Sequence, residues 1–144
     1  MSDLSHFLER LIPDAGSRVS SDLIAIHEIR GLRFDCLHLD RLDPVLSGNK
    51  VFKLLGHLEA WEASGKSSLV SFGGRWSNHL HALAFAAQRL NIPVTALVQG
   101  YPEQPLTPTL QDCIDAGMTI RFCNRGQYAL RYNEAWREQL AVDE

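Results

Sequence analysis

The sequence that decides the fold reads Ser47-Gly48-Asn49-Lys50-Val51-Phe52-Lys53-Leu54. A Gly-Asn pair favours a turn, and the apolar residues after it follow helical spacing, so a helix is predicted from about Asn49 to Gly65. Lys50 then lies in the first turn, where the helix dipole is positive, and Lys53 follows three residues later. Both effects disfavour the ammonium form of Lys50, as Schiff-base formation with a carbonyl cofactor requires. The alternative is a solvated lysine that only happens to start a helix, and position alone favours it.

A second turn of the same kind reads Phe72-Gly73-Gly74-Arg75-Trp76-Ser77-Asn78-His79. Ser77 is a good helix N-cap, and N–H groups at such a turn bind a carboxylate or phosphate readily. Asn78 could donate its amide to an oxygen of a ring or substrate, and His79 could pair with an anion or move a proton. The alternative is that Ser77 only caps the helix and His79 packs or meets solvent. The sequence leaves the two interpretations even.

The rest of the chain alternates strands with helices. A short helix over 3–12 and a linker over 14–17 precede a predicted β-hairpin formed by 23–29 and 32–39. Further strands are predicted over 69–72, 94–98 and 118–122, and further helices over 77–90, 107–116 and 128–140. This order favours an α/β fold with a parallel sheet covered on both faces by helices. Ligands bind such sheets beyond the carboxyl ends of the strands, where both turns are predicted to lie.

Composition and charge exclude several classes of protein. The chain has 144 residues, a net charge of −3 and no basic block, which argues against nucleic acid as a partner. No apolar run approaches a membrane span, and the N-terminus is not a secretory signal, so a cytoplasmic protein is expected. The three cysteines form no CxxC pair, as expected for buried thiols in a reducing compartment. Only His79 and His81 lie close together in sequence. Helical spacing points them apart, so no metal site is expected.

The two turns together resemble the fold-type-II pyridoxal-phosphate enzymes related to tryptophan synthase β. The nearest resemblance is to the 1-aminocyclopropane-1-carboxylate deaminase / D-cysteine desulfhydrase family. That family typically carries SGNK followed by KL, and then GG, two residues and SN before a helix. The matching residues here are Ser47-Gly48-Asn49-Lys50, Lys53-Leu54, Gly73-Gly74 and Ser77-Asn78-His79. Two short motifs at matching spacing are a fairly specific signal, and the resemblance runs from about Ile24 to the C-terminus.

The resemblance implies roles for the matching residues. Lys50 would form the internal aldimine with pyridoxal 5'-phosphate and shuttle the proton of the substrate α-carbon. Asn78 would hydrogen-bond the cofactor ring oxygen. Ser77, Asn78 and His79 would receive the carboxylate of a small amino acid, and Ser77 would also take part in proton transfer. The implied activity is that of a deaminase or desulfhydrase, a lyase or hydrolase of amino-acid metabolism.

The resemblance covers only the N-terminal half of the family fold. Residues 1–48 would be an N-terminal segment of the larger domain, and 49–144 the small α/β domain with the lysine helix. The glycine-rich loop for the cofactor phosphate would follow Glu144, and no such loop occurs here. A non-catalytic fragment, or one half of a split enzyme, is therefore the alternative function. A homo-oligomer or association with the missing half is expected, because a truncated sheet exposes strand edges. A small nucleotide-binding module is a distant third hypothesis.

Overall fold

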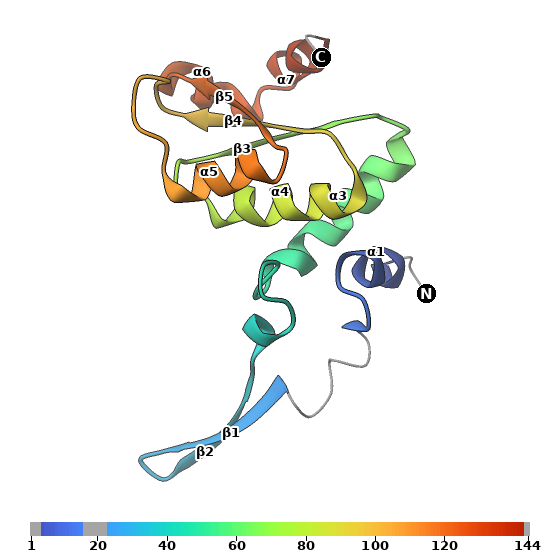
Figure 1. The fold of residues 1–144 in the computed structure, drawn as a ribbon, viewed down its shortest axis with the longest axis vertical. Helices are drawn as coiled ribbons and strands as arrows, with labels where there is room; N and C mark the ends of the chain where they lie inside the picture. Colours follow the sequence, from blue (N-terminus) through green and yellow to red (C-terminus); the bar gives the residue numbers. More distant parts are fainter. Residues whose placement is uncertain (1–3, 16–22, 143–144) are drawn as a thin grey trace. The chain divides into compact units, whose positions relative to one another are not determined.

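The structure is a computed structural model that describes residues 4–15 and 23–142 (Figure 1). The expected linker over 14–17 lies partly outside the described residues. Contacts divide the chain into two compact units, Met1–Gly65 and Lys66–Glu144, and each is described by itself. This division differs from the expected boundary at 48–49, because the lysine helix packs within the first unit. The assignment of these parts to the domains of a larger family fold stays a prediction.

The first unit combines two helices with a hairpin. Helix α1 (Leu4–Leu11) packs on α3 (Lys50–Ser64). Strands β1 (Ile24–Ile29) and β2 (Leu32–Leu37) pair antiparallel, as predicted. Their turn residues Arg30 and Gly31 have φ of 53° and 78°. Two successive positive φ values match the right-handed twist of a two-residue hairpin, and glycine adopts them without strain. A short 3₁₀ helix, η2 (Leu39–Arg41), leads from the hairpin toward α3.

The second unit is built on a parallel three-stranded sheet in the order β3-β4-β5. The strands are β3 (Leu69–Gly73), β4 (Val94–Gln99) and β5 (Thr119–Cys123). Helix α4 (Asn78–Leu90) connects the first two strands and α5 (Pro108–Asp115) the next two. The predicted α/β fold, with a parallel sheet, flanking helices and an antiparallel hairpin, is confirmed at this level.

Helices lie on both sides of the three-stranded sheet (Figure 1). Ser71 hydrogen-bonds His79 of α4, whereas the ring of the next residue, Phe72, lies 5.9 Å from that of Trp136 and 6.5 Å from that of Tyr128. Since neighbouring residues of a strand point to opposite faces, α4 covers one face and the C-terminal helices cover the other. The core therefore has both faces of the sheet covered, as the alternating sequence order predicted.

The prediction of a single helix over 128–140 is wrong. The chain forms α6 (Arg125–Ala129), the 3₁₀ helix η3 (Leu130–Tyr132) and α7 (Glu134–Val142) instead. Asn133 has an extended backbone (ψ 120°), and its side-chain oxygen accepts a hydrogen bond of 3.0 Å from the N–H of Trp136. An asparagine that caps a new helix interrupts the apolar periodicity.

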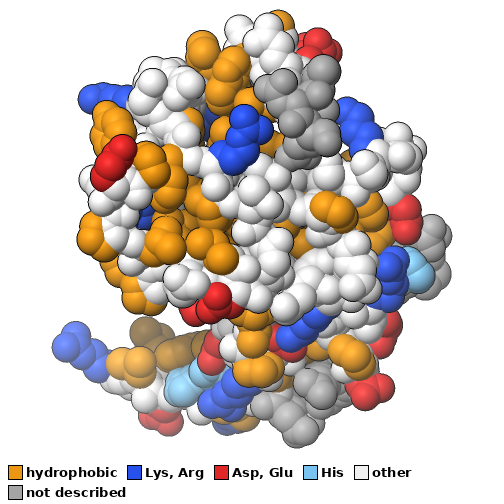
Figure 2. All heavy atoms as spheres, turned by 45° about the horizontal axis from the view of Figure 1, so that its top comes forward, with side chains coloured by type: hydrophobic (Ala, Val, Ile, Leu, Met, Phe, Trp, Pro, Cys, Tyr) orange, Lys and Arg blue, Asp and Glu red, His pale blue; other side chains and the backbone are white. Residues whose placement is uncertain are grey.

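Hydrophobic side chains also reach the surface of the molecule (Figure 2). Six large ones lie on the hairpin with 44–73% of their area exposed: Ile24, Ile26, Ile29, Leu32, Phe34 and Leu37. The described part of the chain contains no helix that is long and apolar enough to cross a membrane.

Candidate functional site

The candidate site of the second unit begins where β3 ends. Helix α4 follows after a short turn, and its N-cap is Ser77, as predicted. The Ser77 hydroxyl oxygen accepts a hydrogen bond of 3.2 Å from the N–H of Leu80. The N–H of Ser77 itself donates to the carbonyl of Gly74 at 3.2 Å. The strand-to-helix turn is thus closed by two hydrogen bonds.

Gly73 allows this turn to sit close to the strand. A Cβ placed on Gly73 would lie 2.7 Å from two side-chain atoms of Leu80 and 2.9 Å from Oγ of Ser77. By contrast, a Cβ on Gly74 would meet no atom of the described residues within 4 Å. The first glycine is therefore required by packing, whereas the second is not.

The three polar residues at the start of α4 point in different directions. In the cap the Ser77 hydroxyl oxygen acts only as an acceptor, so the hydroxyl proton of Ser77 can still be donated to an anion. The Asn78 side chain is exposed. The half-buried ring of His79 is held through Nε2 by a 3.0 Å hydrogen bond with the Ser71 hydroxyl. This turn can therefore offer a hydroxyl and an amide to a ligand, while the imidazole is engaged with the sheet.

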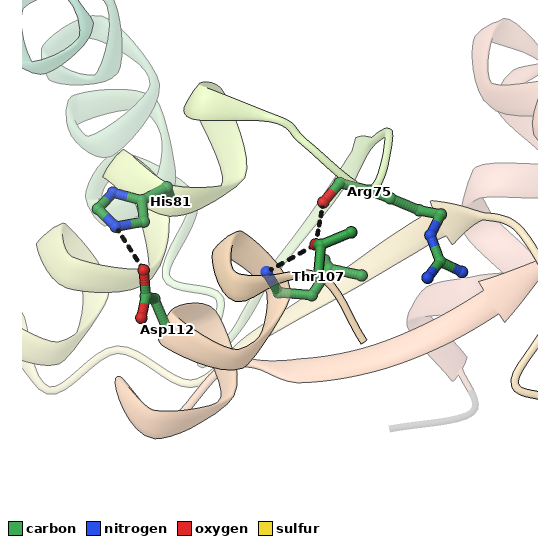
Figure 3. Close-up of polar contacts among 5 residues, drawn as sticks. Arg75, His81, Thr107 and Asp112 are labelled. Carbon is green, nitrogen blue, oxygen red and sulfur yellow. Dashed lines mark hydrogen bonds and ion pairs between the residues drawn. The ribbon is translucent and has the colours of Figure 1, made fainter. Parts of the chain in front are cut away.

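The loop between β4 and α5 is hydrogen-bonded to this turn (Figure 3). The buried hydroxyl of Thr107, which caps α5, donates to the carbonyl of Arg75 at 2.5 Å and accepts from the N–H of Leu110 at 3.2 Å. The Arg75 guanidinium donates in turn to the side chain of Gln104 at 2.6 Å and to the carbonyl of Pro105. The loops that follow β3 and β4 therefore support one another at the carboxyl edge of the sheet.

The helices behind these loops share one further polar contact (Figure 3). Nε2 of His81 on α4 lies 3.5 Å from a carboxylate oxygen of Asp112 on α5. The two side chains are 29% and 54% exposed, so the pair contributes little to stability. His81 is thus a helix-pairing residue, one helical turn from the candidate site.

Lys50 lies in the first unit as the first residue of α3. Its side chain is half-buried, whereas Lys53 is exposed. The residues before it form a hydrogen-bonded turn. Gly48 has a φ of 69°, and its N–H donates to the carbonyl of Leu39 at 3.1 Å. The expected position of the lysine at a helix start, directly after a glycine turn, is confirmed.

Asp43 stabilises the loop that leads to α3. The sequence did not single this residue out. Its carboxylate is 7% exposed and accepts hydrogen bonds from the N–H groups of Val45 and Leu46 at 2.9 and 2.7 Å. Asp43-Pro44 is a common way to open such a turn, and this was the available signal. Thr107 was expected only as the start of a helix, and its bond to Arg75 depends on tertiary structure.

The predicted site residues therefore fall into two groups. Ser77, Asn78 and His79 lie together at the start of α4 in the second unit, whereas Lys50 belongs to the first unit. Their combination into one site stays a prediction.

Two of the cysteines are buried and chemically quiet, as expected. Burial, and secondarily the charge of Asp112, raises the pKa of Cys113 to about 11. Burial also raises the pKa of Cys123. Neither thiol is a nucleophile at neutral pH, because the thiolate is the reactive form. Cys36 differs in being half-buried.

The residues present fit one end of pyridoxal phosphate better than the other. A primary amine at a helix start suits the carbonyl carbon, and the exposed amide of Asn78 suits the ring oxygen. The donor set of the described residues includes no glycine-rich phosphate loop. Lys50 would hold the carbonyl carbon, and no described residue is assigned to the phosphate.

Comparison with known proteins supports the fold. No protein-family model and no curated protein matches the chain. Among solved structures, a hydrogen sulfide-producing enzyme (Fn1220) from Fusobacterium nucleatum is similar, with a TM-score of 0.61 and 16% sequence identity. The similarity covers 90% of this chain and 42% of that enzyme, so this chain spans less than half of the enzyme's length. At this identity the likeness shows the fold alone.

Proposed function

We propose that the chain carries the lysine and the carboxylate-binding turn of a pyridoxal-phosphate-dependent deaminase or lyase. Its substrate would be a small amino acid of the 1-aminocyclopropane-1-carboxylate or D-cysteine type. The observation that carries the proposal is the pair of helix starts, with Lys50 at the first position of α3 and Ser77 as the cap of α4. The similar fold of a hydrogen sulfide-producing enzyme supports a lyase-like activity.

Each residue would have a distinct task. Lys50 would be the covalent anchor and would move the proton of the substrate α-carbon, since a lysine amine can serve both as a nucleophile and as a general base. The Ser77 hydroxyl and the N–H groups of the first turn of α4 would hold the substrate carboxylate. Asn78 would donate to the ring oxygen of the cofactor. The cofactor, when bound, supplies an electron sink for the carbanion.

The Ser71–His79 hydrogen bond refines the role of His79. Because the ring is engaged with β3, the imidazole would position the start of α4. The substrate carboxylate would then meet the backbone at His79 and the hydroxyl of Ser77. A His79→Asn variant would accordingly shift the apparent affinity for substrate more than the turnover rate.

The test is chemical labelling of the lysine. The chain has three lysines, Lys50, Lys53 and Lys66, so a labelled peptide is readily assigned. Incubation with pyridoxal phosphate, borohydride reduction and peptide mapping should place the label on Lys50. A Lys50→Arg variant should lose it, whereas Lys53→Arg should keep it, with circular dichroism confirming that both are folded. A folded sample without label on Lys50 would overturn the cofactor role.

The hairpin favours a second candidate function, that of an assembly partner. Its six exposed apolar side chains lie on a two-stranded ribbon, which is marginally stable by itself in water. A second chain that supplies further strands would cover them. Co-expression with a chain that completes the fold should then raise solubility and labelling of Lys50 together. Failure of labelling with intact assembly would leave this second function in place and remove the first.

A further inference from the structure

The β-hairpin of the first unit brings together three metal-ligating side chains that the sequence separates. His27 lies on β1, Cys36 lies on β2, and His38 follows directly after β2. Each offers one ligand atom, and these three atoms lie within 4.8 Å of one another. We propose that His27, Cys36 and His38 form a Zn²⁺ site, which we call the hairpin site. It is independent of the function proposed above.

The strand register explains why these residues share a face. Cys36 is paired with Ala25, and Phe34 is paired with His27. Residues two apart in a strand point to the same side, so His27 and Cys36 are diagonal neighbours on one face. His38 continues this alternation, because its N–H donates to the carbonyl of Leu23 at 2.7 Å. The rings of the two histidines are 6.0 Å apart between centroids.

His38 has the environment of a metal ligand. Its Nδ1 lies 3.4 Å from a carboxylate oxygen of Asp40, and its side chain is 22% exposed. Its Nε2 is buried and has no hydrogen-bond partner among the described residues. A carboxylate beside Nδ1 favours the proton there and leaves the lone pair on Nε2, which is the usual arrangement of a carboxylate–histidine–zinc unit. A cation at Nε2 would satisfy this otherwise unpaired nitrogen.

The ligand set selects the class of metal. Two imidazoles and a thiolate suit zinc and other late first-row ions, and they do not suit magnesium or calcium, which prefer oxygen. Tetrahedral Zn²⁺ holds nitrogen and sulfur ligands at about 2.0–2.3 Å, so two ligand atoms on one ion lie about 3.3–3.8 Å apart. Side-chain movements of about 1 Å would therefore bring the three ligand atoms of the hairpin site to these distances. Binding would exchange the thiol proton of Cys36 for the metal and release that proton to solvent. The fourth position would hold water, since His27 is exposed.

Cobalt titration of the whole chain tests the hairpin site. After treatment with a chelator, Co²⁺ should bind one per chain and give thiolate-to-cobalt charge-transfer absorption, which Zn²⁺ should then abolish. Cys36→Ser should remove the charge-transfer band, and His38→Ala should weaken binding at least tenfold. Asp40→Asn should weaken it about tenfold, as loss of an outer-shell partner does. His57→Ala, on the exposed face of α3, is the matched control and should bind as the unaltered chain does.

Two outcomes would overturn the proposal. One is a folded chain that takes up no Co²⁺ at concentrations well above those used for known zinc proteins. The other is Co²⁺ uptake that survives in the triple variant of His27, Cys36 and His38, because this indicates adventitious surface binding. Circular dichroism and urea unfolding of the whole chain, measured without metal for each variant, separate loss of the metal site from loss of the fold.

Discussion

At the scale of single residues, Gly73 sets how closely α4 approaches the sheet. Gly73→Ala should lower the free energy of unfolding by about 1–3 kcal/mol, because the added methyl overlaps the buried side chain of Leu80 and the Ser77 cap. Gly74→Ala is the matched control and should change it little, since that position is open and its φ is not positive. Urea unfolding of both variants measures the difference. Equal effects would contradict the close packing described at Gly73.

The buried thiol of Cys113 predicts a loss of stability in base. Its pKa is raised from 9.0 to about 11 in the folded chain, so between these values the unfolded state releases a proton that the folded state keeps. The contribution of Cys113 to the free energy of unfolding is constant below about pH 9 and then falls by about 1.4 kcal/mol per pH unit, about 2–3 kcal/mol in all.

Urea unfolding at about pH 8 and about pH 10.5 checks this dependence. Cys113→Ala removes the titrating group, so its stability should fall less between the two pH values, even though the smaller side chain lowers stability at both. Parallel losses in the two proteins would rule out the thiol as the cause.

At the scale of elements, the two crossover loops are coupled through Thr107. Thr107→Val keeps the shape of the side chain but removes the cap of α5 and the donor to the Arg75 carbonyl. The expected loss is about 1–3 kcal/mol, from a lost cap and a buried carbonyl left unpaired. Thr109→Val, two residues further along in α5, is the control. Increased hydrogen exchange in the 74–77 turn of Thr107→Val alone would confirm the coupling, and exchange confined to α5 would contradict it.

The elements also show what sequence could predict. Apolar periodicity and Gly or Asn stops located the helices and strands between residues 24 and 123, because each element has a distinct period and a chemical end. The prediction of one continuous C-terminal helix failed because Asn124 and Asn133 each cap a new helix. An asparagine cap starts a helix even where the apolar periodicity runs on without a break. The capping box of Asn124 and Gln127 was a readable signal.

The candidate site shows the same division. The helix starts at Lys50 and Ser77 were predicted correctly because a helix start has a local signature, whereas their roles in a site stay a prediction. The cluster of His27, Cys36 and His38 was not found, since it depends on the register of two strands. The local signal was that Cys36 and His38 are two residues apart, a spacing that places both side chains on one face of a strand but not on one face of a helix.

At the scale of the whole molecule, the hairpin predicts self-association of the purified chain. Ile24, Ile26 and Leu37 lie on the face opposite the hairpin site, each at least 51% exposed, and a second copy would bury them. Sedimentation velocity should therefore show a sedimentation coefficient that rises with protein concentration. The double variant Ile26→Lys, Leu37→Lys should sediment as a monomer, whereas Leu106→Lys, an exposed position in the second unit, should behave as the unaltered chain does. A compact monomer at every concentration would contradict self-association through this face of the hairpin.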